Sequence, residues 1–279
     1  MQTRFPIPCV LVAALLLAGA AAAPAQPAGR ALQLADERER SLERAVVYIT
    51  VEYSKPNSTR RSVESGTGFF VTPTQLVTNQ HVISAALGNA SAAITVRILS
   101  GTRESRQLPA EIVATDRAAD LALLTVKGDL PPVEPVRLSP DLIGKQTEVF
   151  AFGFPLGTML DQSVNGPNVC LRRGYVSRLI NDGKNIEADL NIDKGLSGGP
   201  LVDSEGVVRG VVRAMAGSDF NKGFAAIAVS SPVLLDFCST HGLTVTLPDG
   251  KPLEPKQQTA AASLSPATEP APRPLAALD

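Results

Sequence analysis

The chain has 279 residues, of which 26 are basic and 27 acidic, so its formal net charge is −1. This balance excludes the strongly basic surface that proteins present to nucleic-acid phosphates. Two histidines and three cysteines also argue against a His/Cys metal cluster, so we expect no metal, no cofactor and no nucleic-acid partner.

The first 25 residues have the features of a secretory signal peptide. Arg4 provides a positive start, and residues 9–23 form an apolar run that is shorter than the roughly 20 residues needed to span a bilayer. Ala23 and Ala25 are small residues of the kind that signal peptidase recognises, so we expect cleavage after Ala25, the alternative being an uncleaved anchor. The cleaved chain would have no stable membrane span and would be exported, to the periplasm or outside the cell.

The part of the chain after the signal peptide divides into a helical lead, a β-rich middle and a tail. Residues 26–44 are expected to form a linker and helix, because residues 32–46 are amphipathic. Residues 247–279 lose apolar periodicity and are rich in Pro, Ala and small polar residues. Such a composition buries too little surface to offset its ordering entropy, so we expect a disordered tail.

The middle of the chain is expected to be an all-β fold. Short β-branched runs alternate with turn signals about every ten residues, which is typical of small barrels or sandwiches, and helices do not alternate with strands. Prolines at 131, 132 and 135 interrupt the series. We therefore predict one antiparallel barrel over residues 45–135 and a second over residues 136–246, the latter ending in a helix at 231–242.

Two cysteines would remain after signal cleavage, in a compartment that permits disulfides. Cys170 and Cys238 form either one bridge or two free thiols, and their spacing leaves both readings open.

The densest functional signal is the glycine-rich segment around Ser197, residues 195–200. Glycines let the backbone turn tightly, so that a hydroxyl is exposed and unhindered amides converge on one point. These are the needs of a nucleophile with an oxyanion hole, for which the amides of Gly195 and Ser197 are the candidates. The competing reading is a structural loop with the same glycines.

A serine nucleophile needs a general base, and the chain offers only two histidines for that role. Of His81 and His241, His81 follows a predicted strand and begins a short small-residue stretch, whereas His241 stands at a probable helix end. Asp120 leads directly into an apolar strand and is placed to accept an imidazole N–H. Asp116 is the rival acid, and we interpret it as a solvated turn residue.

Residues 195–199 also satisfy the G-x-S-x-G pattern of the α/β-hydrolase nucleophile elbow. That fold requires a helix directly after the serine, but here Pro200 and a Val-rich hairpin follow. The elbow interpretation therefore fails on context.

With these residues in view, the chain resembles the trypsin-like serine proteases of the HtrA/Deg type over roughly residues 45–240. The resemblance is carried by GTGFFVTPTQLVTNQHVI around His81, DRAADLALLTV around Asp120, VFAFGFPLG, GYVS, and EADLNIDKGLSGGPLVDSEGVVRGV around Ser197. It implies two six-stranded antiparallel β-barrels with an active-site cleft between them. It also implies that His81, Asp120 and Ser197 act as the catalytic triad, with Gly195 and Ser197 supplying the oxyanion hole.

The sequence departs from this family pattern in three places. Leu196 replaces the usual Asn, and Asp193-Lys194 replaces the usual Asn-Pro, so the oxyanion loop and first substrate pocket are altered. No PDZ domain follows in this sequence, and the segment at 54–65 is short.

The first substrate pocket is expected to be lined by residues just before Ser197 and by the strand at 211–215. Strand alternation presents either Val212 and Ala214 or Arg213 to the substrate. We favour the apolar pair, together with Leu196, because burying an unpaired guanidinium is costly.

The predicted function is an exported serine endopeptidase that cleaves proteins or peptides through an acyl-enzyme; the sequence does not indicate an oligomeric state. The alternative is a binding module on the same fold whose oxyanion loop is inactive or only conditionally ordered. We prefer the enzyme, because an abandoned site would not need to retain three triad residues.

Overall fold

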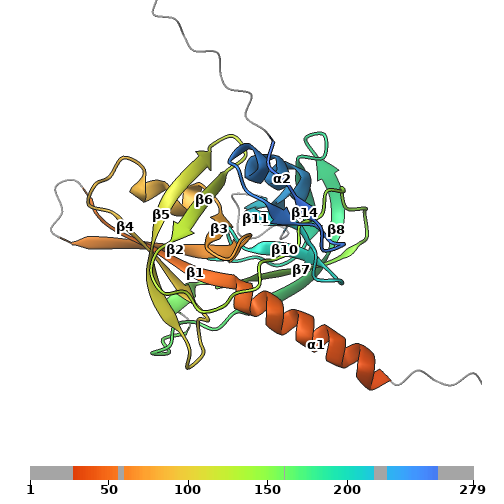
Figure 1. Cartoon of the computed structure of the whole chain (residues 1–279), viewed down its shortest axis with the longest axis horizontal. Helices are drawn as coiled ribbons and strands as arrows, with labels where there is room; N and C mark the ends of the chain where they lie inside the picture. Colours follow the sequence, from red (N-terminus) through yellow and green to blue (C-terminus); the bar gives the residue numbers. More distant parts are fainter. Residues whose placement is uncertain (1–27, 56–59, 160, 217–224, 257–279) are drawn as a thin grey trace, which may run out of the picture.

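The computed structural model describes residues 28–55, 60–159, 161–216 and 225–256 of the chain. The predicted signal peptide lies outside these residues. Strands are the main regular structure of the described chain, and twelve of them fold into two closed antiparallel barrels of six strands each, which confirms the predicted fold class (Figure 1).

The first barrel has the strand order β1-β2-β3-β6-β5-β4 and closes through the pairing of β1 with β4. Its strands are β1 (Val46–Ser54), β2 (Arg61–Phe70), β3 (Gln75–Thr78), β4 (Ala93–Ile98), β5 (Arg106–Asp116) and β6 (Leu121–Val126).

The second barrel has the order β10-β11-β12-β9-β8-β7 and closes through the pairing of β10 with β7. Its strands are β7 (Glu148–Gly153), β8 (Cys170–Ile180), β9 (Asn185–Asp189), β10 (Pro200–Asp203), β11 (Val208–Ala216) and β12 (Ala225–Ser230).

The apolar core of the first barrel continues across the contact between the barrels, and the second barrel also has a core of its own. The β-branched and aromatic residues that predicted the strands fill the barrel interiors, as at Phe69, Phe70 and Leu123, each fully buried. The same cluster continues through Val211 of β11 into the helix α2 (Ser231–Thr240). The barrels are therefore packed against each other by hydrophobic contact, which fixes the geometry of any site between them.

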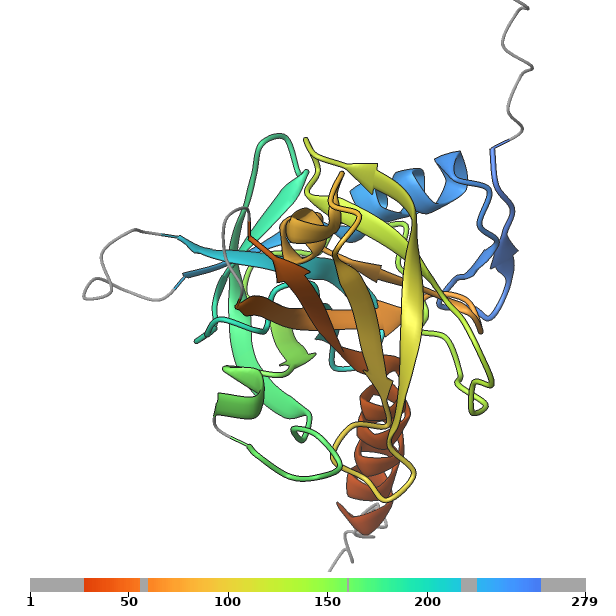
Figure 2. The ribbon, with the colours of Figure 1, turned by 90° about the vertical axis from the view of Figure 1, so that its left-hand side faces the viewer.

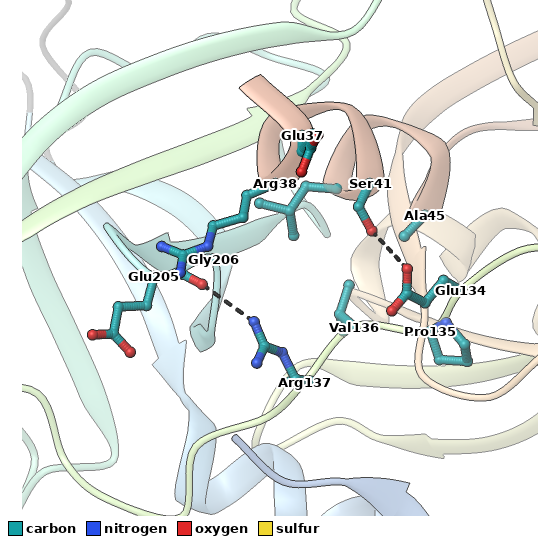
Figure 3. A pocket seen from close by; sticks show the side chains of 11 residues that line it. Glu37, Arg38, Ser41, Ala45, Glu134, Pro135, Val136, Arg137, Glu205 and Gly206 are labelled. Carbon is teal, nitrogen blue, oxygen red and sulfur yellow. Dashed lines mark hydrogen bonds between the residues drawn. The ribbon is translucent and has the colours of Figure 1, made fainter. Parts of the chain in front are cut away.

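The helix α1 (Ala28–Ala45) precedes β1 and projects from the barrels (Figure 1 and Figure 2). It begins four residues before the amphipathic stretch that predicted it. Ser41 donates a hydrogen bond to the Glu134 carboxylate at 3.1 Å (Figure 3). The side chain of Leu42 is buried. A 310 Å³ pocket lies beside this contact, and none of the candidate catalytic residues lines it.

The fold extends past the point where the sequence predicted a disordered tail. After α2 the chain forms a small hairpin of β13 (Val245–Thr246) and β14 (Pro252–Leu253). The Lys256 amide then donates to the Ser239 hydroxyl at 2.7 Å. The prediction that disorder starts at 247 is therefore wrong for residues 247–256, because hydrogen bonds and the packing of Leu247 and Leu253 against the core hold a segment without apolar periodicity. The remainder of the predicted tail, 257–279, lies outside the described residues.

Among the described residues, no helix combines the length and the apolar character needed to cross a membrane.

Candidate active site

A cleft of about 430 Å³ lies between the barrels and holds two of the predicted catalytic residues, His81 and Ser197. Both barrels contribute to its walls. The other lining residues are Tyr48, Val63, Glu64, Ser65 and Val82 from the first barrel and Leu156, Thr158, Met159, Lys194 and Gly195 from the second.

Asp120 stands at the end of the β5–β6 turn in a backbone conformation that residues other than glycine rarely adopt, with φ of 57°. Its carbonyl accepts hydrogen bonds from the Asn79 side chain at 2.9 Å and from the Gln80 amide at 3.3 Å. These bonds tie the turn to the segment leading into His81. Backbone strain held by surrounding contacts is common at functional sites.

The carboxylate of Asp120 meets His81 twice. Its Oδ1 accepts the His81 backbone amide at 2.9 Å, and its Oδ2 lies 2.8 Å from the imidazole Nδ1. Since an ionised carboxylate only accepts, Nδ1 carries the hydrogen and Nε2 is left with its lone pair. His81 itself begins a 3₁₀ helix (His81–Ala86).

The Asp120 carboxyl is buried, and burial alone would raise its pKa. The hydrogen bonds from the His81 ring and amide, helped by the charges of His81 and Arg213, outweigh that effect and hold the pKa of Asp120 below its usual value. Asp120 is therefore ionised at neutral pH.

Asp116, the rival acid, takes the role of a turn residue. Its Oδ1 accepts the amides of Ala118 and Ala119 at 2.8 and 3.0 Å.

Ser197 reaches the cleft at the end of the glycine-rich loop. Its hydroxyl donates to the carbonyl of Arg213 at 3.2 Å, and in the described chain it makes no hydrogen bond to His81. The two side chains line the same cleft.

Two carbonyls of the loop before Ser197 accept hydrogen bonds from neighbouring segments. Leu156 donates its amide to the Lys194 carbonyl at 2.6 Å, and the Thr67 hydroxyl donates to the Gly195 carbonyl at 2.6 Å. Over the described residues, neither the Gly195 amide nor the Ser197 amide donates to another protein group. Unoccupied amides are what an oxyanion hole requires.

Thr67 is a site residue that the sequence reasoning missed. It is fully buried, and besides the bond to Gly195 its hydroxyl accepts the Phe154 amide at 3.1 Å while its amide donates to the Ser197 carbonyl at 2.9 Å. Thr67 therefore fastens the loop of the second barrel to β2 of the first. Its place in the GTGFFV run was the only signal in the sequence.

Gly195 has a conformation and surroundings that only glycine fits. Its φ is +102°, and a Cβ there would lie 2.2 Å from the Phe154 carbonyl oxygen. We expect Gly195→Ala to displace the loop and lower kcat/KM by at least about 10²–10³-fold, the effect of losing one oxyanion donor.

The matched control for Gly195→Ala is Gly88→Ala, which also has positive φ (+70°) but open space around the new methyl group. Steady-state kinetics on labelled casein should show little change for Gly88→Ala. Equal losses in the two variants would trace the effect to general backbone strain and contradict a special role for the loop.

The predicted lining of the first substrate pocket is not found in this cleft. Leu196 and Val212 are both buried in the core of the second barrel, and neither borders the cleft of His81 and Ser197. The side chain of Ala214 lies outside the described part. Arg213, the opposite choice, turns toward Asp120, because a β-bulge between Val212 and Ala214 interrupts the alternation on which the prediction relied.

Cys170 and Cys238 are free thiols in this structure, which is the second of the two alternatives that their spacing left open. Cys170 is half-buried at the start of β8, whereas Cys238 is fully buried in α2, within the core cluster. Burial raises the pKa of the Cys238 thiol to about 12.

This difference predicts selective alkylation. Iodoacetamide at pH 8 should modify Cys170 in the native protein and reach Cys238 only after denaturation, because the thiolate is the reactive species and Cys238 is both inaccessible and protonated. Peptide mass spectrometry reads both sites at once. Recovery of a Cys170–Cys238 disulfide peptide from unreduced protein would contradict this expectation.

Two closed barrels with a histidine, an aspartate and a serine converging between them are the arrangement of two-barrel serine peptidases. The family described as "Trypsin-like peptidase domain" matches residues 66–211, more than half of the chain. The chain belongs to this family, and its relatives place it with the HtrA/Deg type.

One relative is "Magnetosome formation protease MamE" of Paramagnetospirillum magneticum, 36% identical over 179 residues, covering 63% of this chain and 23% of that protein. Another is "Probable periplasmic serine endoprotease DegP-like" of Halomonas elongata, 33% identical over 153 residues, covering 54% and 29%. The solved structure titled "Crystal structure of Deg5" is similar with a TM-score of 0.56 and 25% identity, covering 73% of this chain and 91% of that one. The match thus covers less than a third of either sequence relative's own length.

Proposed function

We propose that the protein is an exported serine endopeptidase that hydrolyses peptide bonds in proteins or peptides. The observation that carries this proposal is the pair of hydrogen bonds that His81 donates to Asp120, beside a cleft that presents both His81 and Ser197. The names of the relatives support peptidase activity over a binding module, and the name of one of them supports a periplasmic or otherwise exported location.

The proposed reaction begins when the Ser197 hydroxyl turns from the Arg213 carbonyl to His81. Ser197 Oγ forms a bond to the substrate carbonyl carbon while Nε2 of His81 takes the hydroxyl proton. The carbonyl π electrons move to the oxygen, and the resulting negative charge is stabilised by the amides of Gly195 and Ser197. Asp120 fixes the ring tautomer and stabilises the imidazolium.

Collapse of this intermediate breaks the C–N bond and gives the acyl-enzyme. The leaving amine takes the proton from His81, and a water molecule then attacks the ester with His81 again acting as base. The second product leaves as an acid, and Ser197 recovers its proton. The cycle needs no metal or cofactor.

The experiment that tests this function is active-site labelling of the purified protein. A fluorophosphonate probe should label the wild type and leave Ser197→Ala unlabelled, and unfolded casein should be cleaved by the wild type alone. Absence of both labelling and cleavage in folded wild-type protein would exclude the peptidase and favour the binding module.

A further inference from the structure

Arg213 is the extra residue of the β-bulge in β11. Val212 pairs with Ala228 of β12 and Ala214 pairs with Ile227, so no residue of β12 stands opposite Arg213. A bulge re-aims the side chain it carries, and bulges are frequent beside active sites. Here the guanidinium leaves the sheet and crosses to the first barrel.

The guanidinium bonds to the same carboxylate oxygen as the imidazole. Asp120 Oδ2 lies 3.1 Å from Arg213 Nε and 2.8 Å from His81 Nδ1, which places the two nitrogens within about 6 Å of each other. Asp120 Oδ1 is occupied by the His81 amide. One buried carboxylate therefore serves an arginine that is always charged and a histidine that must gain a charge during catalysis.

Arg213 also contacts the nucleophile. Its backbone carbonyl accepts the Ser197 hydroxyl at 3.2 Å. The residue thus touches the acid through its side chain and the nucleophile through its main chain, and it reaches the histidine only through Asp120.

We propose that Arg213 is a positioning residue that fixes the Asp120 carboxylate and, by sharing its negative charge, keeps His81 a free base to lower pH. This inference rests on the proposed peptidase function. The physical reason is that the guanidinium repels a positive charge on the nearby imidazole, which lowers the pKa of the ring. Neutralising part of the Asp120 charge lowers that pKa as well, because the imidazolium is then less stabilised by the carboxylate.

Other titratable groups lie near His81 and Arg213, in the cleft and in a second groove. On the cleft side, Glu64 of β2 accepts the Tyr53 hydroxyl at 2.7 Å, and Lys194 precedes the oxyanion loop. Tyr48 of β1 also lines the cleft.

Arg213 further borders a second groove, of about 530 Å³, which carries four more charged residues: Asp116, Asp182, Lys184 and Asp236. The side chain of Arg213 is 37% exposed there. Since substitutions at Arg213 leave these four residues and the cleft groups in place, a change in the titration of His81 reports on Arg213.

The test compares Arg213→Gln, which keeps a hydrogen-bond donor but removes the charge, with Arg213→Lys, which keeps the charge. The matched control is Arg178→Gln, which removes a cation from the ion pair with Glu187 on the same barrel. The acid limb of the kcat/KM–pH profile should move to higher pH by about one unit in Arg213→Gln, by less than half of that in Arg213→Lys, and not at all in Arg178→Gln. Below the midpoint, Arg213→Gln is then about tenfold slower than the wild type.

A second readout does not depend on activity. With Ser197→Ala and His241→Asn in the background, His81 is the only imidazole in the chain, and its titration can be followed by NMR. Its midpoint should rise by the same amount when Arg213→Gln is added. Arg213→Met, which also lacks the charge, takes the place of Arg213→Gln if that variant does not fold.

The possible outcomes separate the inference from the function. Wild-type protein that neither labels nor cleaves, but in which Arg213→Gln shifts the His81 titration, would overturn the peptidase and keep the charge coupling. Active protein whose acid limb and His81 titration are the same with and without the Arg213 charge would overturn the inference and keep the peptidase. An equal shift in Arg178→Gln would also overturn it, because the effect would then be one of net charge.

Discussion

Replacing Ser197 by alanine will lower kcat/KM on labelled casein by about 10⁶-fold, and replacing His81 by alanine will cost about as much. The two side chains act as one unit, because the serine hydroxyl is a weak nucleophile unless the imidazole removes its proton. The double variant should therefore be no slower than either single variant, with residual activity from the oxyanion loop and substrate binding alone. Initial rates at high enzyme concentration measure all three.

The control for these variants is His241→Asn, at the other histidine of the chain. His241 is the C-cap residue of α2, and its ring packs edge-on against Phe237 with centroids 4.7 Å apart. It does not line the cleft of His81 and Ser197. Its rate should stay close to that of the wild type. Strict additivity of the Ser197 and His81 losses, or a comparable loss at His241, would contradict a base–nucleophile pair.

Much of the site was readable from the sequence because chemistry limits the choices. Of the two histidines in the chain, only His81 follows a predicted strand. Of the two candidate acids, Asp120 leads directly into an apolar strand, whereas Asp116 is a turn residue that accepts a backbone amide. The structure brings His81 and Asp120 into two hydrogen bonds, and it gives Asp116 the turn that the sequence assigned to it. Local sequence sufficed here because each residue's role follows from the element it borders.

The parts that the sequence could not predict all depend on contacts between distant segments. Thr67 fastens a loop 128 residues away, and Arg213 faces Asp120 only because a bulge breaks the alternation of β11. No periodicity encodes either contact. The chain up to Lys256 is likewise ordered by individual contacts, such as the hydrogen bond from the Lys256 amide to Ser239 and the packing of Leu247 and Leu253 against the core.

Asp120→Asn is expected to lower kcat/KM by about 10⁴-fold at neutral pH while leaving the fold in place. An asparagine amide that turns its NH₂ toward Nδ1 favours the tautomer with hydrogen on Nε2, and that ring has no lone pair to accept the serine proton. It also leaves Arg213 facing a neutral side chain in place of its carboxylate partner. The loss should therefore fall mainly on kcat, measured by steady-state kinetics and checked by circular dichroism.

Asp116→Asn is the matched control for Asp120→Asn, because it removes the same charge four residues earlier and an asparagine can still accept the amides of Ala118 and Ala119. It should retain nearly full activity. The two variants should also differ in stability against pH. The lowered pKa of Asp120 means that its ionised form stabilises the wild type above the ordinary carboxyl pKa, and that this contribution is lost as the pH falls through the folded value. Urea unfolding of Asp120→Asn should accordingly lose that acid dependence, and an unchanged dependence together with wild-type kcat would assign the orienting carboxylate to another residue.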